Sequence, residues 1–310
     1  MGRQGKKRQL TFDNIFIIGV GRQPIWADST QDRQYKGSGE RMKINAEEKK
    51  AGLLSESNLA LAIRFFLDQG FVILEEVLPL PWVHNLRSAT NVELESKYEG
   101  KEGELERARR HGGTPSPMKM PFTDPLIIEN PMTFQILEHV FGERFYGSLP
   151  YGCNTAFPGS EAQNVHRDCG HLFPELEVAL PPVLIVVNFS LDQFTADNGA
   201  TEIWPGSHHT LNDDKNEIGT LRVGVERPAR YPSVQMVMPA GSIILRDMRT
   251  WHRGMPNTTD KPRTMLSLVY FRQFYLPDNL GAAVTDLTDE EWNQFSPRAK
   301  LVYRLRRSLE

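Results

Sequence analysis

The sequence is poor in cysteine and has no large excess of charge of either sign. Only two of the 310 residues are cysteines, Cys153 and Cys169, which is too few for a disulfide scaffold and suits a reducing compartment. The formal net charge of −3 lacks the basic excess that binding to nucleic acid or to an anionic membrane requires. We therefore expect a small-molecule substrate and no nucleic-acid or membrane partner.

Long hydrophobic runs, internal repeats and low-complexity tracts are also missing. No apolar stretch approaches the ~20 residues that cross a bilayer, and the N-terminal residues lack the apolar core of a signal peptide. We expect a cytoplasmic protein in which residues 1–50 form a loosely ordered basic arm and residues 51–310 form one domain. A homodimer formed through the arm or through a C-terminal helix is compatible with the sequence.

Helical patterns dominate the first part of the chain. Apolar residues at helical spacing begin near Ser55 and end at Gly70, a short strand pattern follows at 71–74, and a second helix pattern covers 80–98. Residues 101–121 are charged and then rich in glycine and proline, which predicts a loop or lid. Further helices are expected at 130–141 and, near the end of the chain, at 289–307.

The central part of the chain has the pattern of a β-protein. Its β-rich or alternating segments are separated by glycine, proline, asparagine and aspartate. They are 145–157, 162–168, 182–191, 200–204, 234–238, 242–246 and 263–274. Because no long helix interrupts them, the grouping favours a sandwich or jelly roll. We expect a mainly β, α+β protein whose jelly-roll core, at about 145–275, has helices before and after it.

A His-x-Asp sequence is the strongest candidate for chemistry. Side chains alternate along an extended strand, so His166 and Asp168 point to one side while Arg167 points to the other. These two ligands make half of an open metal site, and His252 is the best candidate for the third. Distant strands meet across a jelly roll, so the separation of 84 residues (252 − 168) is no obstacle. Two histidines and a carboxylate form the open metal face of non-haem Fe(II) oxygenases.

Arg263 lies 11 residues after His252 (263 − 252), at the start of the last strand pattern. Its planar guanidinium can pair with a carboxylate through two hydrogen bonds and keeps its charge when buried. A dicarboxylate cosubstrate could therefore chelate the metal at one end and bind Arg263 at the other. The alternative interpretation is a surface residue that follows Pro262.

The order of these residues resembles the phytanoyl-CoA dioxygenase family of Fe(II)- and 2-oxoglutarate-dependent oxygenases, over about residues 55–274. The motifs that carry the resemblance are His166-x-Asp168, Asp197-Asn198-Gly199-Ala200-Thr201, Pro205-Gly206-Ser207-His208, and His252 with Pro256-Asn257 and Arg263. The resemblance implies a double-stranded β-helix, cupin-like core. It also implies that His166, Asp168 and His252 hold iron and that Arg263 anchors 2-oxoglutarate.

The resemblance further implies a reaction. Dioxygen and 2-oxoglutarate give succinate, carbon dioxide and an oxidant that removes hydrogen from a substrate C–H bond, usually leading to hydroxylation. Similar families also desaturate, epoxidise, rearrange or form endoperoxides. Gln163 and Thr201 are candidate hydrogen-bond partners of the cosubstrate, or ordinary strand and turn residues.

Two other classes of function remain open. A cupin-like metal-dependent isomerase or hydrolase would use the same ligands but would not need Arg263. An inactive small-molecule-binding barrel would keep the fold and would be expected to lack a ligand. For the substrate, Phe157, Phe173, Met236 and Met238 near the motifs favour a lipophilic small molecule, as in secondary metabolism.

Several polar residues receive structural interpretations. His171 is expected on the polar surface, and His208 belongs to the turn of the family and is not an expected iron ligand. Asp247 is a candidate to orient His252 or to fold the turn below it. The arginines at 107, 109 and 110 could bind an acidic group of the substrate. The favoured alternative is that they pair with the glutamates at 102, 104 and 106 on a solvated face.

Overall fold

The computed structural model describes residues 41–173, 175, 176, 178–211, 221–224, 226, 228–275 and 287–306. The α-helices in this part are α1 (Ala46–Ala51), α2 (Glu56–Gln69), α3 (Leu80–Tyr98), α4 (Glu102–Arg107), α5 (Pro125–Ile128), α6 (Pro131–Phe141), α7 (Asp289–Asn293) and α8 (Pro297–Val302). Short 3-10 helices lie at Ser207–His209, Pro228–Arg230 and Arg304–Arg306. No described helix combines the length and apolar composition needed to cross a membrane.

The described strands form two facing sheets. The larger sheet contains β1 (Arg41–Lys43), β2 (Phe71–Glu75), β11 (Ile243–Asp247), β7 (Leu184–Ser190), β13 (Arg263–Arg272), β5 (Gly152–Ala156) and β3 (His111–Gly112) in that order, with β4 (Phe145–Gly147) also paired to β13. The smaller sheet has the order β10 (Val234–Gln235), β8 (Glu202–Ile203), β12 (His252–Arg253), β6 (His166–Arg167) and β9 (Leu221–Arg222). The chain crosses from one sheet to the other along β5, β6, β7 and β8, and again along β11, β12 and β13. This alternation is that of a double-stranded β-helix, so the predicted fold class is confirmed.

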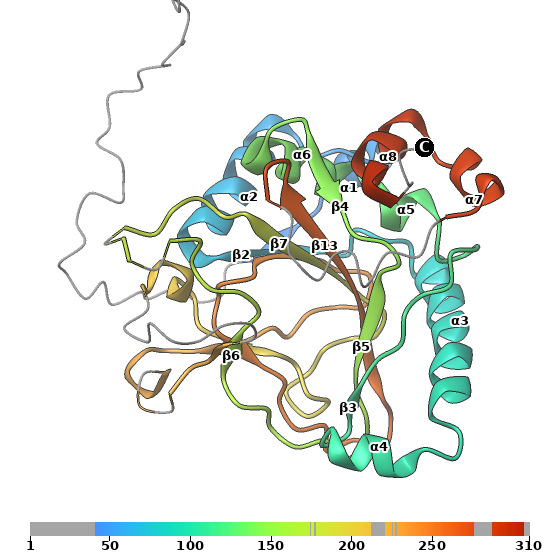
Figure 1. Cartoon of the computed structure of the whole chain (residues 1–310), viewed down its shortest axis with the longest axis vertical. Helices are drawn as coiled ribbons and strands as arrows, with labels where there is room; N and C mark the ends of the chain where they lie inside the picture. Colours follow the sequence, from blue (N-terminus) through green and yellow to red (C-terminus); the bar gives the residue numbers. More distant parts are fainter. Residues whose placement is uncertain are drawn as a thin grey trace, which may run out of the picture. The chain divides into compact units, whose positions relative to one another are not determined.

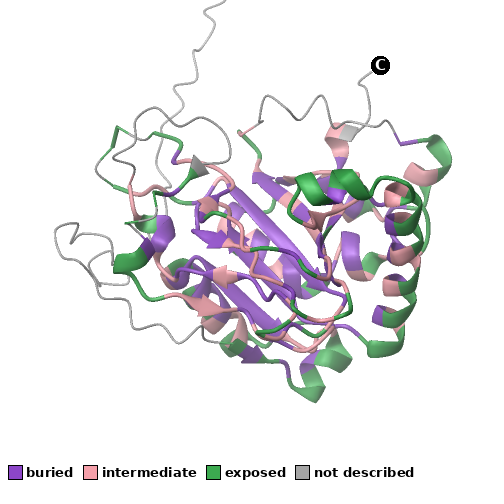
Figure 2. Cartoon of the chain, turned by 90° about the horizontal axis from the view of Figure 1, so that it is seen from below, coloured by how far each residue is buried: buried purple, intermediate pink, exposed green. Residues whose placement is uncertain are grey.

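Helices cover the outer face of the larger sheet (Figure 1). Side chains alternate along β13, so Leu266 and Leu268 are fully buried in the core shared with α2 and α6. The alternate residue Met265 packs with Ile203 of β8, on the side of the smaller sheet. Figure 2 shows the buried strands inside and the exposed faces of the helices outside. The inner face of the larger sheet is therefore the wall opposite β6, β8 and β12.

The end of α2 is attached to the turn that precedes His252. Gly70 ends the helix with φ of 84°, a backbone conformation that favours glycine. Its carbonyl accepts hydrogen bonds from the backbone N–H of Asp247 (2.8 Å) and from Oγ1 of Thr250 (3.1 Å). The first long helix thus supports the segment that carries a candidate metal ligand.

The structure confirms most of the expected elements and changes three of them. The segment 101–121 is not all loop, since Leu105 is buried in α4 and His111 pairs with Ala156 to form β3. The expected helix at 289–307 is divided into α7 and α8, because Ser296 caps a new helix. Residues 41–50, expected in the arm, form β1 and most of α1, since Met42 pairs with β2 and is buried. The prediction for residues 1–40 lies outside the described residues.

Candidate metal centre

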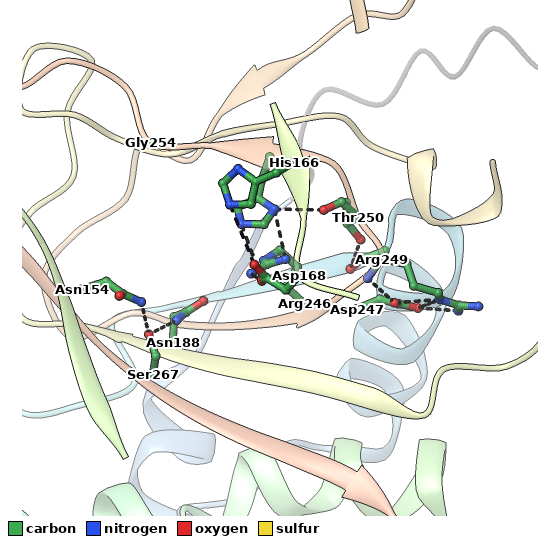
Figure 3. A network of polar contacts seen from close by, with 12 residues as sticks. Asn154, His166, Asp168, Asn188, Arg246, Asp247, Arg249, Thr250, Gly254 and Ser267 are labelled. Carbon is green, nitrogen blue, oxygen red and sulfur yellow. Dashed lines mark hydrogen bonds and ion pairs between the residues drawn. The ribbon is translucent and has the colours of Figure 1, made fainter. Parts of the chain in front are cut away.

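His166, Asp168 and His252 converge between the two sheets, where Figure 3 shows His166 and Asp168 from close by. One ligand atom from each residue lies within 4.8 Å of the others. Nε2 of His166 is 3.8 Å from Oδ1 of Asp168, and Nε2 of His252 is 3.6 Å from Oδ2. Within the part of the chain that the structure describes, this is the only such group of three histidine, cysteine or acidic residues.

Strand register brings the two histidines together. His166 of β6 and His252 of β12 are directly opposed residues of an antiparallel pair. Directly opposed side chains leave the sheet on the same face, and the two ring centres are 4.3 Å apart. Asp168 follows β6, where its backbone N–H donates to the carbonyl of Met248 (2.9 Å). The segments around the two histidines thus hold all three side chains in place.

Hydrogen bonds to backbone carbonyls select the tautomer of both histidines. Nδ1 of His166 lies 2.8 Å from the carbonyl oxygen of Asn164, and Nδ1 of His252 lies 3.0 Å from that of Thr250. A carbonyl oxygen only accepts hydrogen bonds and is the nearer partner of each Nδ1, at 3.0 Å for His252 against 3.3 Å for Nη1 of Arg246, so each Nδ1 carries the proton and each Nε2 has a lone pair. Both lone pairs are on the nitrogen atoms nearest Asp168, as metal ligation requires.

Arg246 lies against two of the three candidate ligands. Its Nη2 donates to Oδ2 of Asp168 at 2.6 Å, and its Nη1 is 3.3 Å from Nδ1 of His252. Burial opposes the charge of Asp168, but the Arg246 guanidinium that donates to it outweighs this and holds the pKa of the carboxyl well below its usual range. Burial, with Arg246 beside the ring, lowers the pKa of His252 to about 3. An anionic carboxylate and a neutral imidazole are the forms that bind a cation.

Arg246 was not among the residues selected from the sequence. It occupies an inward position of β11, in the run Ser242-Ile243-Ile244-Leu245-Arg246. A charged residue in a strand whose other members are all buried was the available signal, because buried charges are rare unless they are paired. Its partner could be identified only after the fold had brought Asp168 to it.

Arg263 is a buried cation without a carboxylate partner among the described residues. Its side chain is covered, its guanidinium stacks over the ring of Phe194 at 4.4 Å, and it donates to the carbonyl of Gly199. Its Nε has no hydrogen-bond partner. Burial lowers the pKa of Arg263 to about 10, although Asp192 opposes this shift. The unused donor fits a carboxylate supplied by a ligand.

The nearest acidic residue is already occupied. Both carboxylate oxygens of Asp192 accept from Nε of Arg87 at 2.9 Å, and Oδ2 also accepts from the backbone N–H of Thr264 at 2.7 Å. The charge of Asp192 is therefore compensated by Arg87. The predicted position of Arg263 at the start of β13 is correct, and the alternative of a surface residue is wrong.

Gln163 and Thr201 lie near the centre in different ways. Oε1 of Gln163 accepts from the backbone N–H of Gly254 (2.9 Å), which leaves its amide NH₂ group for another partner. Gln163 also lines a cavity of about 400 Å³ beside His166. Thr201 is buried next to β8, and its carbonyl accepts from the backbone N–H of Met236 (2.9 Å). Their roles toward a cosubstrate stay predictions.

A polar cluster occupies the inner wall of the larger sheet. Oγ of Ser267 lies 2.8 Å from Nδ2 of Asn154 and 2.7 Å from Nδ2 of Asn188, on three adjacent strands (Figure 3). Sequence analysis did not select these residues. Polar side chains at inward positions of apolar strands are the signal that would have found them.

Three other expectations can be compared with the structure. Asp247 pairs with Arg249 at 2.6 Å, and Nδ1 of His252 lies against the carbonyl of Thr250, so Asp247 does not orient that histidine. The alternative is confirmed, because Oδ1 and the carbonyl of Asp247 accept from the backbone N–H groups of Arg249 (2.9 Å) and Thr250 (3.0 Å) in the turn. His171 is buried and bonds to the carbonyl of Thr210 (3.0 Å), so its expected surface position is wrong. His208 is also buried, with Nε2 3.0 Å from the carbonyl oxygen of Leu67 in α2.

Known sequences similar to this chain include a family profile and individual dioxygenases. A sequence profile of the phytanoyl-CoA dioxygenase (PhyH) family matches residues 66–265. Dioxygenase aneA of Aspergillus aculeatus is 32% identical over 181 residues, which cover 56% of this chain and 52% of that protein. The iron/alpha-ketoglutarate-dependent dioxygenase ausU of Aspergillus calidoustus is 25% identical over 226 residues, which cover 70% of this chain and 71% of that protein. The chain thus spans about half the length of the first relative.

Solved structures share the fold. The epimerase SnoN, solved in complex with Fe³⁺, alpha ketoglutarate and nogalamycin RO, gives a TM-score of 0.53 at 16% identity, over 74% of this chain and 91% of that chain. AviO1 from Streptomyces viridochromogenes gives a TM-score of 0.52 at 19% identity, over 72% of this chain and 99% of that chain. At these identities the likeness shows the fold alone.

Proposed function

The chain belongs to the phytanoyl-CoA dioxygenase family, and we propose that it is an Fe(II)- and 2-oxoglutarate-dependent dioxygenase that oxidises, most simply by hydroxylation, a C–H bond of a small molecule with a lipophilic part. The observation that carries this proposal is the convergence of His166, Asp168 and His252 within 4.8 Å, in the protonation states that bind a cation. The guanidinium of Arg263 has an unused Nε donor and no carboxylate partner among the described residues, which favours an oxygenase over an isomerase or hydrolase that has no need of it.

The residues divide the work as follows. The two Nε2 atoms and the Asp168 carboxylate would hold the metal, while Arg246 donates to Oδ2 of that carboxylate and so orients it. Bound Fe(II) would supply the oxidative chemistry, in which 2-oxoglutarate takes up one oxygen atom of O₂ and gives succinate and carbon dioxide, and the other oxygen atom serves to oxidise the C–H bond. Arg263 binds the far carboxylate of the cosubstrate, and the NH₂ group of Gln163 and the hydroxyl of Thr201 donate further hydrogen bonds to it.

A lipophilic part of the substrate is supported by the segment after Asp168. Leu172, Phe173, Leu176 and Val178 expose 37–48% of their surface there. Exposed apolar side chains that follow a candidate metal ligand in the sequence offer apolar surface to a lipophilic molecule. Two of the residues that first favoured such a substrate, Met236 and Met238, are instead buried in the core.

The proposal is tested by adding Fe(II) and then 2-oxoglutarate to the protein without oxygen. A weak visible charge-transfer band that needs both additions, and that fades as succinate forms in air, is the expected result. Arg263→Gln should raise the 2-oxoglutarate concentration for half-maximal band by about tenfold or more, because a charge-assisted pair is lost. Arg253→Gln is the matched control, since Arg253 pairs with Glu202 at 2.5 Å. The absence of a band at saturating iron would contradict the proposal.

The ligand set is tested separately. His166→Ala and Asp168→Ala should each abolish Fe(II) binding, measured by calorimetry, while circular dichroism shows a folded protein. Neither side chain is fully buried, so neither substitution leaves a large cavity in the core. Metal affinity retained in both variants would refute the assignment of the ligands.

A further inference from the structure

A row of three side chains crosses the smaller sheet, and only two of them are candidate metal ligands. His252 is opposed to His166 in β12 and β6, and His166 is in turn opposed to Arg222 in β9. All three therefore leave the sheet on the same face, with the Cβ atoms of His166 and Arg222 about 5 Å apart. Arg222 makes no ion pair with any described carboxylate. A cation thus stands next to the metal centre in the same row.

A second arginine reaches the same place from another part of the chain. Arg109 and Arg222, with Gln163, Asn164 and His166, line the cavity of about 400 Å³. Nε of Arg109 is 3.9 Å from Glu161, and these side chains are 55% and 69% exposed, so this pair is weak. The glutamates of α4 do not neutralise Arg109, because the ion pair there is formed by Arg110 with Glu106.

The backbone that presents Arg109 is strained. Arg109 and Arg110 have φ of 51° and 57°, a backbone region that is unfavourable for residues other than glycine. The turn is held by Arg110, whose Nε donates to the carbonyl of Pro158 (2.6 Å) and whose carbonyl accepts from the backbone N–H of Phe157 (3.0 Å). Strained backbone of this kind gathers at ligand sites.

The cavity offers hydrogen-bond donors and positive charge. It has the two guanidinium groups of Arg109 and Arg222, while the NH₂ group of Gln163 is the donor proposed for the cosubstrate. We propose that Arg109 and Arg222 bind an anionic oxygen group of the substrate, a carboxylate or a phosphate, and so hold the substrate beside the metal centre. The inference rests on the proposed function and adds to it the chemical class of the substrate, a lipophilic acid.

This anion is distinct from the cosubstrate. Arg263 is 3% exposed on the larger sheet and provides the buried donor that 2-oxoglutarate needs. Arg109 and Arg222 are exposed and line the cavity, Arg222 from β9 of the smaller sheet and Arg109 from the turn that precedes β3. The site therefore has one inner and one outer cationic position, which suits two different anions.

The test uses the protein loaded with Fe(II) and 2-oxoglutarate without oxygen. Decanoate, decyl phosphate and uncharged decanol are each titrated into the protein, and binding is measured by calorimetry. The change that each compound causes in the visible band is recorded as a second readout. Both acids should bind at least about tenfold more tightly than decanol, and the tighter acid tells a carboxylate site from a phosphate site. Arg109→Gln and Arg222→Gln should each weaken acid binding about tenfold without changing the affinity for 2-oxoglutarate. Arg253→Gln, whose guanidinium is paired with Glu202, should change neither.

Several results would overturn the inference. They are equal affinity for decanol and the acids, no acid binding at millimolar concentration, and unchanged acid binding in the two variants. A loss of 2-oxoglutarate affinity in Arg222→Gln as large as that in Arg263→Gln would assign the outer arginine to the cosubstrate instead. Calorimetry detects acid binding whether or not the band forms, so failure of the proposed function gives a different result from failure of this inference.

Discussion

Arg246 contacts two of the three candidate metal ligands, and its effect can be measured without a substrate. It donates to Asp168 at 2.6 Å and lies 3.3 Å from His252. Because groups that bond to metal ligands fix the orientation of those ligands, their loss typically costs 10–100-fold in affinity. We expect Arg246→Met to weaken binding of Fe(II) or Mn(II) by about 10–100-fold, measured by calorimetry.

Two further variants separate orientation from charge. Arg246→Lys keeps the charge and one hydrogen bond and should recover part of the affinity. Arg253→Met, next to His252 in sequence but paired with Glu202, should bind the metal as the parent does. If Arg246→Met binds the metal as tightly as the parent or more tightly, repulsion between Arg246 and the cation outweighs the positioning of Asp168.

At the scale of single residues, predictability depended on how local the signal was. His166, Asp168, His252 and Arg263 could be found because their spacing matches a family motif and a known ligand set. Arg246 and Arg222 could not, because their roles arise from partners 78 and 56 residues away (246 − 168 and 222 − 166). The sequence around one residue does not show which distant residue the fold will place beside it.

Helix α2 and the turn before His252 depend on one glycine. A Cβ atom on Gly70 would lie 2.4 Å from Oγ1 of Thr250 and 2.6 Å from Nδ1 of His208, and the residue has φ of 84°. Backbone strain and these contacts together should make Gly70→Ala lower the free energy of unfolding by about 2 kcal/mol or more. Because the turn would shift, metal affinity should fall as well. Urea denaturation and calorimetry measure the two effects.

Gly52 provides the matched control. It ends α1 with φ of 69°, and a Cβ atom there would meet nothing within 4 Å. Gly52→Ala should therefore show the conformational cost alone, about 1 kcal/mol, with unchanged metal binding. Equal destabilisation in the two variants would show that the contacts at Gly70 are relieved by small shifts.

Elements were predictable where short-range signals define them. Pro81 marks the start of α3, and Gly70 and Gly142 mark the ends of α2 and α6. The long apolar runs of β7 and β13 are recognisable as strands from the sequence. The strands of the smaller sheet are only two residues long. They exist because other strands lie beside them, so no local pattern fixed their bounds. The same holds for β3 within the supposed loop.

Buried histidines make the stability of the whole molecule depend on pH. Burial lowers the pKa of His171 to about 4 and that of His208 to about 3. In the unfolded chain both titrate at about 6.5, so below that pH the unfolded state binds protons that the folded state does not. Stability should be full above about pH 6.5 and fall by about 1.4 kcal/mol per pH unit for each histidine as the pH decreases.

Urea unfolding of the metal-free protein between about pH 7.5 and pH 5 measures this slope. His208→Gln keeps a donor for the carbonyl of Leu67 and removes one titrating group, so it should reduce the slope by about one proton. His84→Gln, at an exposed histidine, is the control and should leave the slope unchanged. An unchanged slope in His208→Gln would show that this histidine is protonated in the folded protein.

For the molecule as a whole, the order of helix and strand patterns in the sequence predicted the fold, but it did not predict which distant residues lie together. The grouping of β-rich segments between residues 145 and 274 predicted the double-stranded β-helix. The cavity beside His166 is formed by residues from 109 to 222, so its lining and charge required the structure. For the same reason, the hydrophobic residues near the motifs had different outcomes, since Met236 and Met238 are buried in the core whereas Phe173 is exposed.

Because His166 and His252 are directly opposed, metal binding depends on the correct pairing register of β6 and β12. A slip of one residue between β6 and β12 would send one imidazole to the opposite face. Such a molecule would keep nearly all of its helices and strands, and its circular dichroism would hardly change. It would nevertheless be unable to load iron at this site. The fraction of molecules that bind metal at this site therefore reports the fraction in which β6 and β12 are paired in the correct register.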